Sequence, residues 1–372
     1  MTDSTDTMPP LRRTFREEYL LAGAVIIGVL AYACEHALVD NGPLVALAAA
    51  AVLVAAIVGV SLRVAHHAEI LAEKVGDPYG SMILTLSAVL VEVVILGIMV
   101  GHEQSPTLVR DTIYAAVMLD INGILGLAAL MGGLKHGEQS YNDDSGRVYG
   151  VMILTAMGIS MIVPEFIPEA RRHIYAIYTI GAMLVLYSLF VRMQVGAHSY
   201  FFSYSYPEKR RRSTHPQPHA ANSSMMSAGI LVLGIVIIGA LAEVMSKSLN
   251  VSLAAMSAPP MLAGLLVATI SACPEILTAL RAALANRMQS VVNIAMGASL
   301  STVILTVPAM EALSLLTGKP LEMAMTPVQT VMVAITLFAA AINLNDGQTN
   351  AIEGMTHFIL FTAFLMLTAL GL

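Results

Sequence analysis

The chain has 372 residues, of which 57% are hydrophobic and only 12% charged, with a mean hydropathy of +0.75 and a formal net charge of −6. Soluble domains carry about 25% charged residues, so the composition excludes a soluble protein and predicts an integral membrane protein. Nothing in it favours nucleic-acid binding. The two cysteines, Cys34 and Cys273, both lie in apolar segments, so no disulfide framework is expected.

Apolar segments long enough to cross a bilayer recur along the whole chain. A membrane-spanning helix needs about 20 apolar residues, and eleven such segments are predicted, the first of them a retained helix rather than a cleaved signal. In chain order the expected spans are Tyr19–Leu38, Leu44–Leu71, Tyr79–Val100, Thr112–Gly132, Val148–Pro164, Ile174–Gln194, Met225–Ser246, Met261–Ala283, Ser290–Leu313, Pro327–Asn343 and Ala351–Leu370.

One long polar stretch with the basic run 209–212 divides these spans into two sets of five. We expect an N-terminal segment with the first helix at 1–43, a first repeat at 44–196, a cytoplasmic basic linker at 197–223 and a second repeat at 224–372. Because five is odd, the second repeat is inverted relative to the first. The predicted fold is therefore an all-α membrane protein of about 11 transmembrane helices, made of the first helix and two inverted five-helix repeats.

The distribution of basic residues predicts the orientation in the membrane. With the N-terminus in the cytoplasm and the C-terminus outside, fourteen of the 19 Lys and Arg residues fall on the cytoplasmic side. Positive charge is enriched in cytoplasmic loops, so this orientation is favoured. The expected location is the inner cell membrane, with many passes through the bilayer.

Two spans each carry a lone carboxylate near the middle, Glu92 in the third and Glu275 in the eighth. A charge at that depth costs roughly 2.5–3.5 kcal/mol on insertion scales, so such residues usually have a function. Each lies about three residues past the centre of its span, roughly 4–5 Å at 1.5 Å per residue. Since the two spans run in opposite directions, the pair is expected to straddle the bilayer midplane as one cation and proton site.

Such a pair predicts exchange of cations for protons. A carboxyl group away from water is favoured in its protonated form, and it becomes a ligand when a cation replaces the proton. Two of them are neutral with two protons or with one divalent ion. Because Ca²⁺ takes 6–8 oxygen ligands, further oxygens are expected from Thr85, Ser271, Thr278 and the carbonyl of Ile270, which Pro274 leaves without its usual donor.

A second group of polar residues in the apolar spans forms a predicted proton or access path: Glu69, Glu243, Asp120, Ser299 and Ser301. Glu69 near a helix end is equally consistent with an interfacial charge, and serines in membrane helices are more often close-packing residues. The central carboxylates themselves have an alternative reading as residues that pin neighbouring helices together. A matched pair is harder to explain in that way than a single glutamate.

The sequence resembles the calcium/cation–proton exchangers, the CAX branch of the cation/calcium exchanger superfamily, and within it the bacterial ChaA type. Four stretches in the same order carry the resemblance, at 67–96, 111–142, 265–308 and 343–361. The first stretch contains Glu92 near its end, and the third contains Glu275. The second stretch ends in a GG–EQ–N pattern, at Gly132, Gly133, Glu138, Gln139 and Asn142. The fourth has a DG-xx-N-xx-EG pattern, at Asp346, Gly347, Asn350, Glu353 and Gly354.

The resemblance implies two inverted five-helix repeats and exchange of a cytosolic cation for external protons through Glu92 and Glu275. The chain departs from the family in lacking Gly-Asn before each glutamate, where Ala88-Val89 and Ser271-Ala272 stand instead, and in having a basic linker. Loss of the Asn amide removes a strong calcium ligand. The resemblance implies Ca²⁺ as the cargo, the lost amide makes Na⁺ or K⁺ the alternative, and no cofactor is expected.

The alternatives from other classes of protein are a channel and a membrane-embedded enzyme. A cation channel is the remote alternative, because channels are more naturally oligomers of few helices than single chains with inverted repeats. A membrane-embedded metalloprotease would need a zinc motif such as HExxH, which the stretch HHAEILAE at 66–73 does not match. The protein is therefore expected not to be an enzyme, and its partners are small cations, protons and the lipid bilayer.

Overall fold

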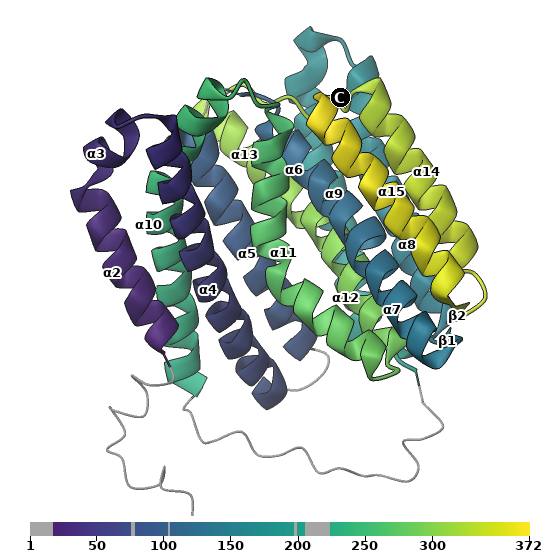
Figure 1. The fold of residues 1–372 in the computed structure, drawn as a ribbon. Coiled ribbons are helices and arrows are strands. Elements are labelled where there is room, and N and C mark those ends of the chain that lie inside the picture. The colour runs from purple at the N-terminus through teal and green to yellow at the C-terminus, as the bar shows by residue number, and fades with distance from the viewer. Residues whose placement is uncertain (1–17, 76–78, 103–104, 197–198, 205–223) are drawn as a thin grey trace, which may run out of the picture.

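The computed structural model describes residues 18–75, 79–102, 105–196, 199–204 and 224–372 (Figure 1). Within these ranges the chain is a bundle of helices joined by short connections. Nine helical runs are long and apolar enough to cross a membrane, and two shorter apolar helices, Tyr19–Ala33 and Pro327–Asn343, bring the described spans to eleven. The predicted all-α membrane architecture is confirmed.

The regular elements follow one another with few interruptions. In chain order they are α2 (Tyr19–Ala33), α3 (Glu35–Asp40), α4 (Pro43–Val75), α5 (Tyr79–His102), α6 (Leu108–Met118), η1 (Leu119–Leu125), α7 (Gly126–His136), β1 (Gln139–Ser140), α8 (Asp143–Met157), η2 (Gly158–Ile162), η3 (Val163–Phe166), η4 (Glu169–Arg171), α9 (Arg172–Val195), η5 (Ser199–Phe202), α10 (Ser224–Ala255), α11 (Met261–Leu284), α12 (Met288–Ser301), η7 (Thr302–Thr306), α13 (Val307–Thr317), α14 (Pro327–Asn343), β2 (Gln348–Thr349) and α15 (Ala351–Leu370).

The predicted boundaries hold best at the C-terminal end and least well at the N-terminal end. Helices α14 and α15 have the bounds expected from the sequence. The first span does not continue to Leu38, because Cys34 leaves the helical region with φ −107° and ψ 11° and separates α2 from α3. Helices α4 and α10 run beyond their apolar segments, to Val75 and Ala255, because polar residues continue the helix past the hydrophobic run.

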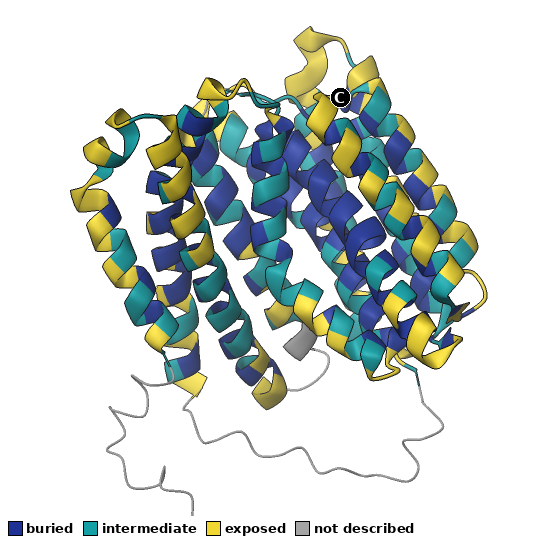
Figure 2. Cartoon of the chain, in the orientation of Figure 1, coloured by how far each residue is buried: buried dark blue, intermediate teal, exposed yellow. Residues whose placement is uncertain are grey.

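The most buried run of the bundle is the helix formed by α6, η1 and α7. In its most apolar window 89% of the residues are buried, against 17% for the helix that contains α9. Figure 2 shows this contrast as dark ribbons in the middle of the molecule and exposed stripes on α14, α15 and α2. Outer helices turn apolar side chains to the lipid, whereas the central helix is surrounded by protein.

Two π-helical segments interrupt corresponding helices in the two halves. Segment η1 joins α6 to α7, and segment η7 joins α12 to α13. In each case the helix that carries a central glutamate packs on the π segment of the other half, since α5 contacts η7 and α11 contacts η1. Short π-helical turns are rare and frequent at functional sites. The two halves are thus interlocked at η1 and η7, two of the three π-helical segments among the described residues, the third being η2 after α8.

The glycines of the GG and EG patterns allow α7 and α15 to pack with their backbones almost in contact. A Cβ on Gly133 would lie 2.3 Å from the backbone nitrogen of Ala351, and a Cβ on Gly354 would lie 2.2 Å from that of Leu130. The strands β1 and β2 pair beside this contact, with Gln139 opposite Thr349 and Ser140 opposite Gln348. These two patterns therefore fix the contact between the last helix and the central one.

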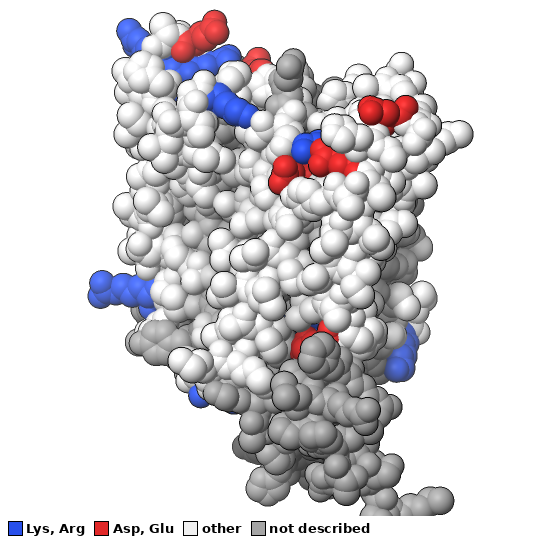
Figure 3. Space-filling view, turned by 90° about the vertical axis from the view of Figure 1, so that its left-hand side faces the viewer, with Lys and Arg blue, Asp and Glu red and all other residues white. Residues whose placement is uncertain are grey.

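Charged side chains on the face formed by the N-terminal helices are sparse and gather toward its two ends, with a broad uncharged band between them (Figure 3). Such a band is the surface expected to contact lipid acyl chains. The described part of the chain begins at one end of the bundle, where α10 also begins, and the C-terminus lies at the other end (Figure 1). The end at which α10 begins is called the linker end below.

Candidate functional site

A cavity of about 640 Å³ extends from the middle of the bundle to the linker end. Its walls come from α4, α5, α11 and α12, and Gln194, Ser199, Phe202 and Ser203 line it where α9 ends and η5 begins. Both Glu92 and Glu275 line this cavity. The two carboxylates that the sequence singled out, 183 positions apart in the numbering, therefore face one space.

Glu92 is held from one side by two hydroxyl groups of the other half of the chain. The Oγ1 atoms of Thr302 and Thr306 donate to its Oε2 atom at 3.0 and 3.1 Å. These threonines open and close η7, so the π-helical turn places both hydroxyls on one carboxylate oxygen. The side chain is 2% exposed, and its Oε1 atom has no hydrogen-bond partner among the described residues. One oxygen is thus fixed and the other is available.

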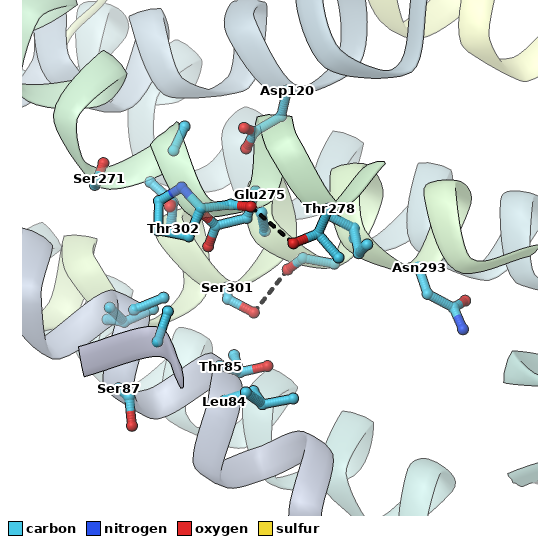
Figure 4. Close-up of a pocket in the computed structure, with 18 of the residues that line it drawn as sticks. Leu84, Thr85, Ser87, Asp120, Ser271, Glu275, Thr278, Asn293, Ser301 and Thr302 are labelled. Carbon is cyan, nitrogen blue, oxygen red and sulfur yellow. Dashed lines mark hydrogen bonds between the residues drawn. The ribbon is translucent and has the colours of Figure 1, made fainter. Parts of the chain in front are cut away.

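Glu275 has different surroundings. It lies one residue after Pro274 in α11, and its Oε2 atom is buried without a hydrogen-bond partner in the described part of the chain. Asp120 of η1, a segment that packs against α11, also lines the cavity; it is 2% exposed and accepts a hydrogen bond of 3.1 Å from the Oγ atom of Ser299. Figure 4 shows Asp120, Glu275 and Thr302 around the same space, each on a different helix.

The expected oxygen ligands are only partly brought together. Thr85, Ser271 and Thr278 all line the cavity, on the two helices that carry the glutamates. The hydroxyl of Thr278 donates to the carbonyl of Pro274 at 2.9 Å, and that of Ser271 donates to the carbonyl of Ala268 at 3.0 Å. Ile270 is 1% exposed and does not line the cavity.

The predicted secondary path divides into residues inside and outside the cavity. Glu69, Asp120 and Ser301 line it, and Ser299 lies behind Asp120 as its hydrogen-bond donor. Ser301 donates to the carbonyl of its own helix at Gly297. Glu243 lies elsewhere.

Glu243 belongs to a polar cluster near the outer surface of α10. Its Oε2 atom accepts a hydrogen bond of 2.6 Å from the Tyr32 hydroxyl, and its Oε1 atom lies 3.4 Å from the ammonium of Lys247. Lys247 in turn pairs with Glu35 at 2.7 Å, and His102 lies 4.0 Å from Glu243. These partners join α10 to α2, α3 and α5, and the residue lies outside the lining of the central cavity.

Sequence reasoning missed several polar groups at the site, chiefly Thr302 and Thr306. Ser61 of α4 lines the cavity with a buried hydroxyl that has no partner among the described residues, and Asn293 of α12 lines it near the linker end. The spacing of the two threonines, four residues apart in an apolar run, was a usable signal for a shared helix face. Their common partner was not predictable, because it comes from a helix more than 200 residues away.

The end of the bundle opposite the cavity mouth is closed by a buried polar network. Asp111 accepts hydrogen bonds from Arg110 at 2.9 Å and from Gln329 at 3.0 Å through its Oδ1 atom, and from Thr107 at 2.9 Å through Oδ2. Arg110 also donates to the carbonyl of Ala324. Arg110 and Asp111 form an ion pair. The network joins α6 to α14 through Gln329 and leaves neither of these two charges unpaired.

The acidic and hydroxyl side chains are spread along the cavity wall. Within the described ranges no three His, Cys, Asp or Glu side chains stand close enough together to hold a metal ion. The carboxylates instead line a space open enough for a hydrated ion, with hydroxyls on its walls. Two buried oxygens without partners, Glu92 Oε1 and Glu275 Oε2, are the positions that gain most from a proton or a cation.

Curated relatives cover most of the chain. It is 32% identical over 318 residues to the sodium-potassium/proton antiporter ChaA of Escherichia coli, an alignment that covers 82% of this chain and 84% of that one. It is 30% identical over 349 residues to the putative ionic transporter y4hA of Sinorhizobium fredii, with 92% and 93% covered.

Solved structures share the fold. The structure of native YfkE superposes with a TM-score of 0.74 at 17% identity and covers 95% of this chain and 99% of that one. The H⁺/Ca²⁺ exchanger CAX gives a TM-score of 0.62 at 15% identity, covering 94% and 88%. The sequence profile described as sodium/calcium exchanger protein matches residues 45–196 and 226–370, one stretch on each side of the linker. The chain therefore belongs to the sodium/calcium exchanger protein family.

Proposed function

We propose that this protein is a proton-coupled cation antiporter that exports cytosolic Ca²⁺ in exchange for H⁺. The observation that carries the proposal is that Glu92 and Glu275, from opposite halves of the chain, line one cavity and each has a buried oxygen without a partner. Relatives named as sodium-potassium/proton and Ca²⁺/H⁺ antiporters support this type of transport.

The chemistry follows from the cost of isolated charge. Two ionised carboxylates buried at one cavity repel each other and have lost much of their hydration, so the site is most stable when protons or a cation neutralise them. A cation that enters from the linker end displaces the protons, and protons that return displace the cation. Thr302 and Thr306 keep one oxygen of Glu92 in place during both steps. Asp120 adds a third acidic group to the lining of the cavity.

The membrane arrangement is part of the proposal. Two inverted repeats at 44–196 and 224–372 agree with the two stretches matched by the family profile and with the crossed packing of α5 on η7 and α11 on η1. We infer that the linker end is cytoplasmic, because the basic run 209–212, which lies outside the described residues, belongs to it. A cysteine at position 213, also outside the described residues, should react with a membrane-impermeant maleimide only from the cytoplasmic side.

Na⁺ or K⁺ is the alternative cargo, and one observation favours it. Apart from carboxylates, the polar side chains near the two glutamates are mainly hydroxyls, whereas the amide of Asn293 donates to the carbonyl of Phe202 and accepts from Gln289. Ca²⁺ binds best to many oxygens, with carboxylates and carbonyls prominent among them. Loss of amide ligands should therefore weaken divalent binding more than monovalent binding.

The deciding experiment is fluorescence dequenching of a pH-gradient probe in energised everted vesicles, with Ca²⁺, Na⁺ and K⁺ added in turn. Proton release on addition of a cation identifies that cation as cargo. Release with Ca²⁺ alone would exclude the alternative. Cation flux without any proton movement would contradict antiport and would favour a channel.

A further inference from the structure

A further buried carboxylate, outside the central cavity, lies on the far side of the bundle from the cavity mouth. Glu311 of α13 is 5% exposed, and its Oε2 atom has no hydrogen-bond partner among the described residues. It takes no part in the central cavity. A carboxyl oxygen that is buried and unpartnered is costly, because the group has given up water without a replacement.

Glu311 lines a small cavity of its own, of about 40 Å³. The walls come from the turn after α8, the first turns of α9 and the segment before α14, and the lining residues are Pro164, Ile167, Arg172, Tyr175, Ala176, Met323 and Ala324. All three segments lie at the end opposite the linker end, which in the proposed orientation is the outer face. A cavity needs only about 10–15 Å³ to admit a water molecule.

The other titratable groups in this cavity leave Glu311 without a fixed partner. The Tyr175 hydroxyl donates to the carbonyl of Ile159 at 2.8 Å, so its proton is already engaged. Arg172 lines the cavity from an exposed position at the start of α9. Glu165, Lys319 and Glu322 lie on the neighbouring segments but do not line the cavity. The cavity has room for little more than water beside Glu311, so the ion that this carboxylate can take up there is a proton.

Glu311 is built on the same helical run as the two hydroxyls that hold Glu92. Helices α12, η7 and α13 form one continuous run from Met288 to Thr317. Glu311 follows Thr306 by five residues, or about 7.5 Å along the helix axis at 1.5 Å per residue. The run therefore has a donor to the central site at its middle and an acid facing the outer cavity one and a half turns further on.

We propose that Glu311 is a proton-binding site that is protonated from the outer face. It takes up the protons that enter in exchange for the cation. The inference rests on the proposed antiport and on its direction. In this role Glu311 makes the rate of exchange depend on external pH, although it is distinct from the carboxylates that bind the cation. External acid protonates Glu311, and external alkali leaves it as the carboxylate, with no other bond made or broken.

The test uses right-side-out vesicles with fixed internal pH, in which the rate of cation release is measured at external pH values from about 6 to 9, a range that brackets a buried carboxyl group. In Glu311→Gln we expect the midpoint of the external-pH profile to shift by about one pH unit or more, or the profile to become flat. The internal cation concentration for half-maximal rate should stay unchanged. Glu165→Gln, an exposed carboxylate in the neighbouring turn, is the matched control and should behave as the wild type.

A second measurement applies if Glu311→Gln fails to fold. A hydrophobic carbodiimide modifies protonated carboxyl groups in apolar surroundings, and mass spectrometry of the wild-type protein then reports whether Glu311 is modified. Modification that increases as the external pH falls supports the proposal. An unchanged pH profile in a folded Glu311→Gln protein, or no modification at any pH, would overturn it. If the wild type moves no protons at all, the proposed antiport fails instead, so the two failures are distinguishable.

Discussion

The surroundings of Glu92 and of Glu275 differ, although the helices around them correspond. Each glutamate lies in the middle of an apolar helix that packs on a π-helical segment of the other half. Glu92 meets two threonine hydroxyls on η7, whereas the corresponding segment η1 presents Asp120, whose hydrogen bond comes from Ser299. The two halves thus share backbone geometry but differ in the polar groups that face each glutamate, and this difference predicts unequal roles for the two carboxylates. Glu92 accepts hydrogen bonds from two neutral hydroxyls, whereas Glu275 shares its side of the cavity with the carboxyl group of Asp120.

The largest effect is expected from removing either central charge. In Glu92→Gln or Glu275→Gln the cavity loses one of the two charges that attract the cation and take up the protons, so exchange should fall by at least about 100-fold, equivalent to about 2.7 kcal/mol. The variants should still insert and fold, because the amide is neutral and isosteric. Dequenching assays with all three cations measure the loss.

Near-normal exchange by either glutamine variant would contradict a shared site for the two carboxylates. The exposed Glu169 of η4 offers a control, because Glu169→Gln lies outside the cavity and should keep normal exchange. Detergent-solubilised yield and a monodisperse elution profile would show that the variants are folded.

A smaller effect is expected from the hydroxyls that distinguish the Glu92 side. A hydrogen bond to a charged group contributes about 1.5–3 kcal/mol, so Thr302→Val with Thr306→Val should reduce the apparent cation affinity by roughly 10-fold or more. Thr302→Ser with Thr306→Ser keeps both donors and should restore most of it. Equal behaviour of the valine and serine pairs would show that the threonines only pack, and the half-saturating cation concentration decides between the two.

The charge difference between η1 and η7 can be tested directly at Asp120. Asp120→Asn removes the third acid of the cavity while keeping an acceptor for Ser299. If the acid helps to attract divalent ions, the ratio of Ca²⁺ to Na⁺ exchange should fall by a few-fold with exchange still present. An unchanged ratio would mean that Asp120 serves the packing of η1 on α12.

The sequence predicted the structure well where an apolar run is bounded by clear helix-capping residues. Helices α14 and α15 are bounded by sharp signals, a Thr326–Gln329 capping box in one case and the Asn350 cap in the other, and their limits were predictable to the residue. The lone carboxylates Glu92 and Glu275 stood out because charge is rare in apolar helices. The break at Cys34 has no capping signal of this kind, although the apolar run ends there and Glu35 and His36 follow directly.

The partners of the site residues were not predictable, for a physical reason. A π-helical turn is set by tertiary contacts rather than by local propensity, so nothing in the run 302–306 announces that two hydroxyls meet one carboxylate. Glu243 shows the opposite case. By depth it resembled a site residue, but its partners are Tyr32 and Lys247 in a cluster outside the cavity lining. The position of a residue along an apolar helix predicts its depth in the membrane, but it does not predict which face of the helix carries the side chain.

The smallest effect is expected at a carboxylate that is fully partnered. Glu18, just before α2, accepts a hydrogen bond of 3.0 Å from Arg63 and lies 3.0 Å from His67, both of α4. Partial burial acts to raise the pKa of Glu18, but the hydrogen bonds and charges of Arg63 and His67 outweigh it and hold that pKa below its ordinary value. Because the folded-state pKa is the lower one, the stabilisation is present above the unfolded pKa and is lost as the pH falls through the folded one.

Glu18→Gln should therefore lower the thermal unfolding midpoint only slightly at neutral pH, since a part-exposed ion pair contributes about 0.2–1 kcal/mol. The difference from wild type should begin to shrink as the pH falls below the ordinary glutamate pKa of about 4.3, and it should vanish once the pH is below the lowered folded-state pKa of Glu18. Exchange should be unaffected, because Glu18 does not line the cavity. Thermal unfolding in detergent at several pH values measures the first effect, with Asp40→Asn on α3 as a control. A Glu18→Gln deficit that persists undiminished in acid would show that the residue acts through packing of α2 on α4 rather than through its charge.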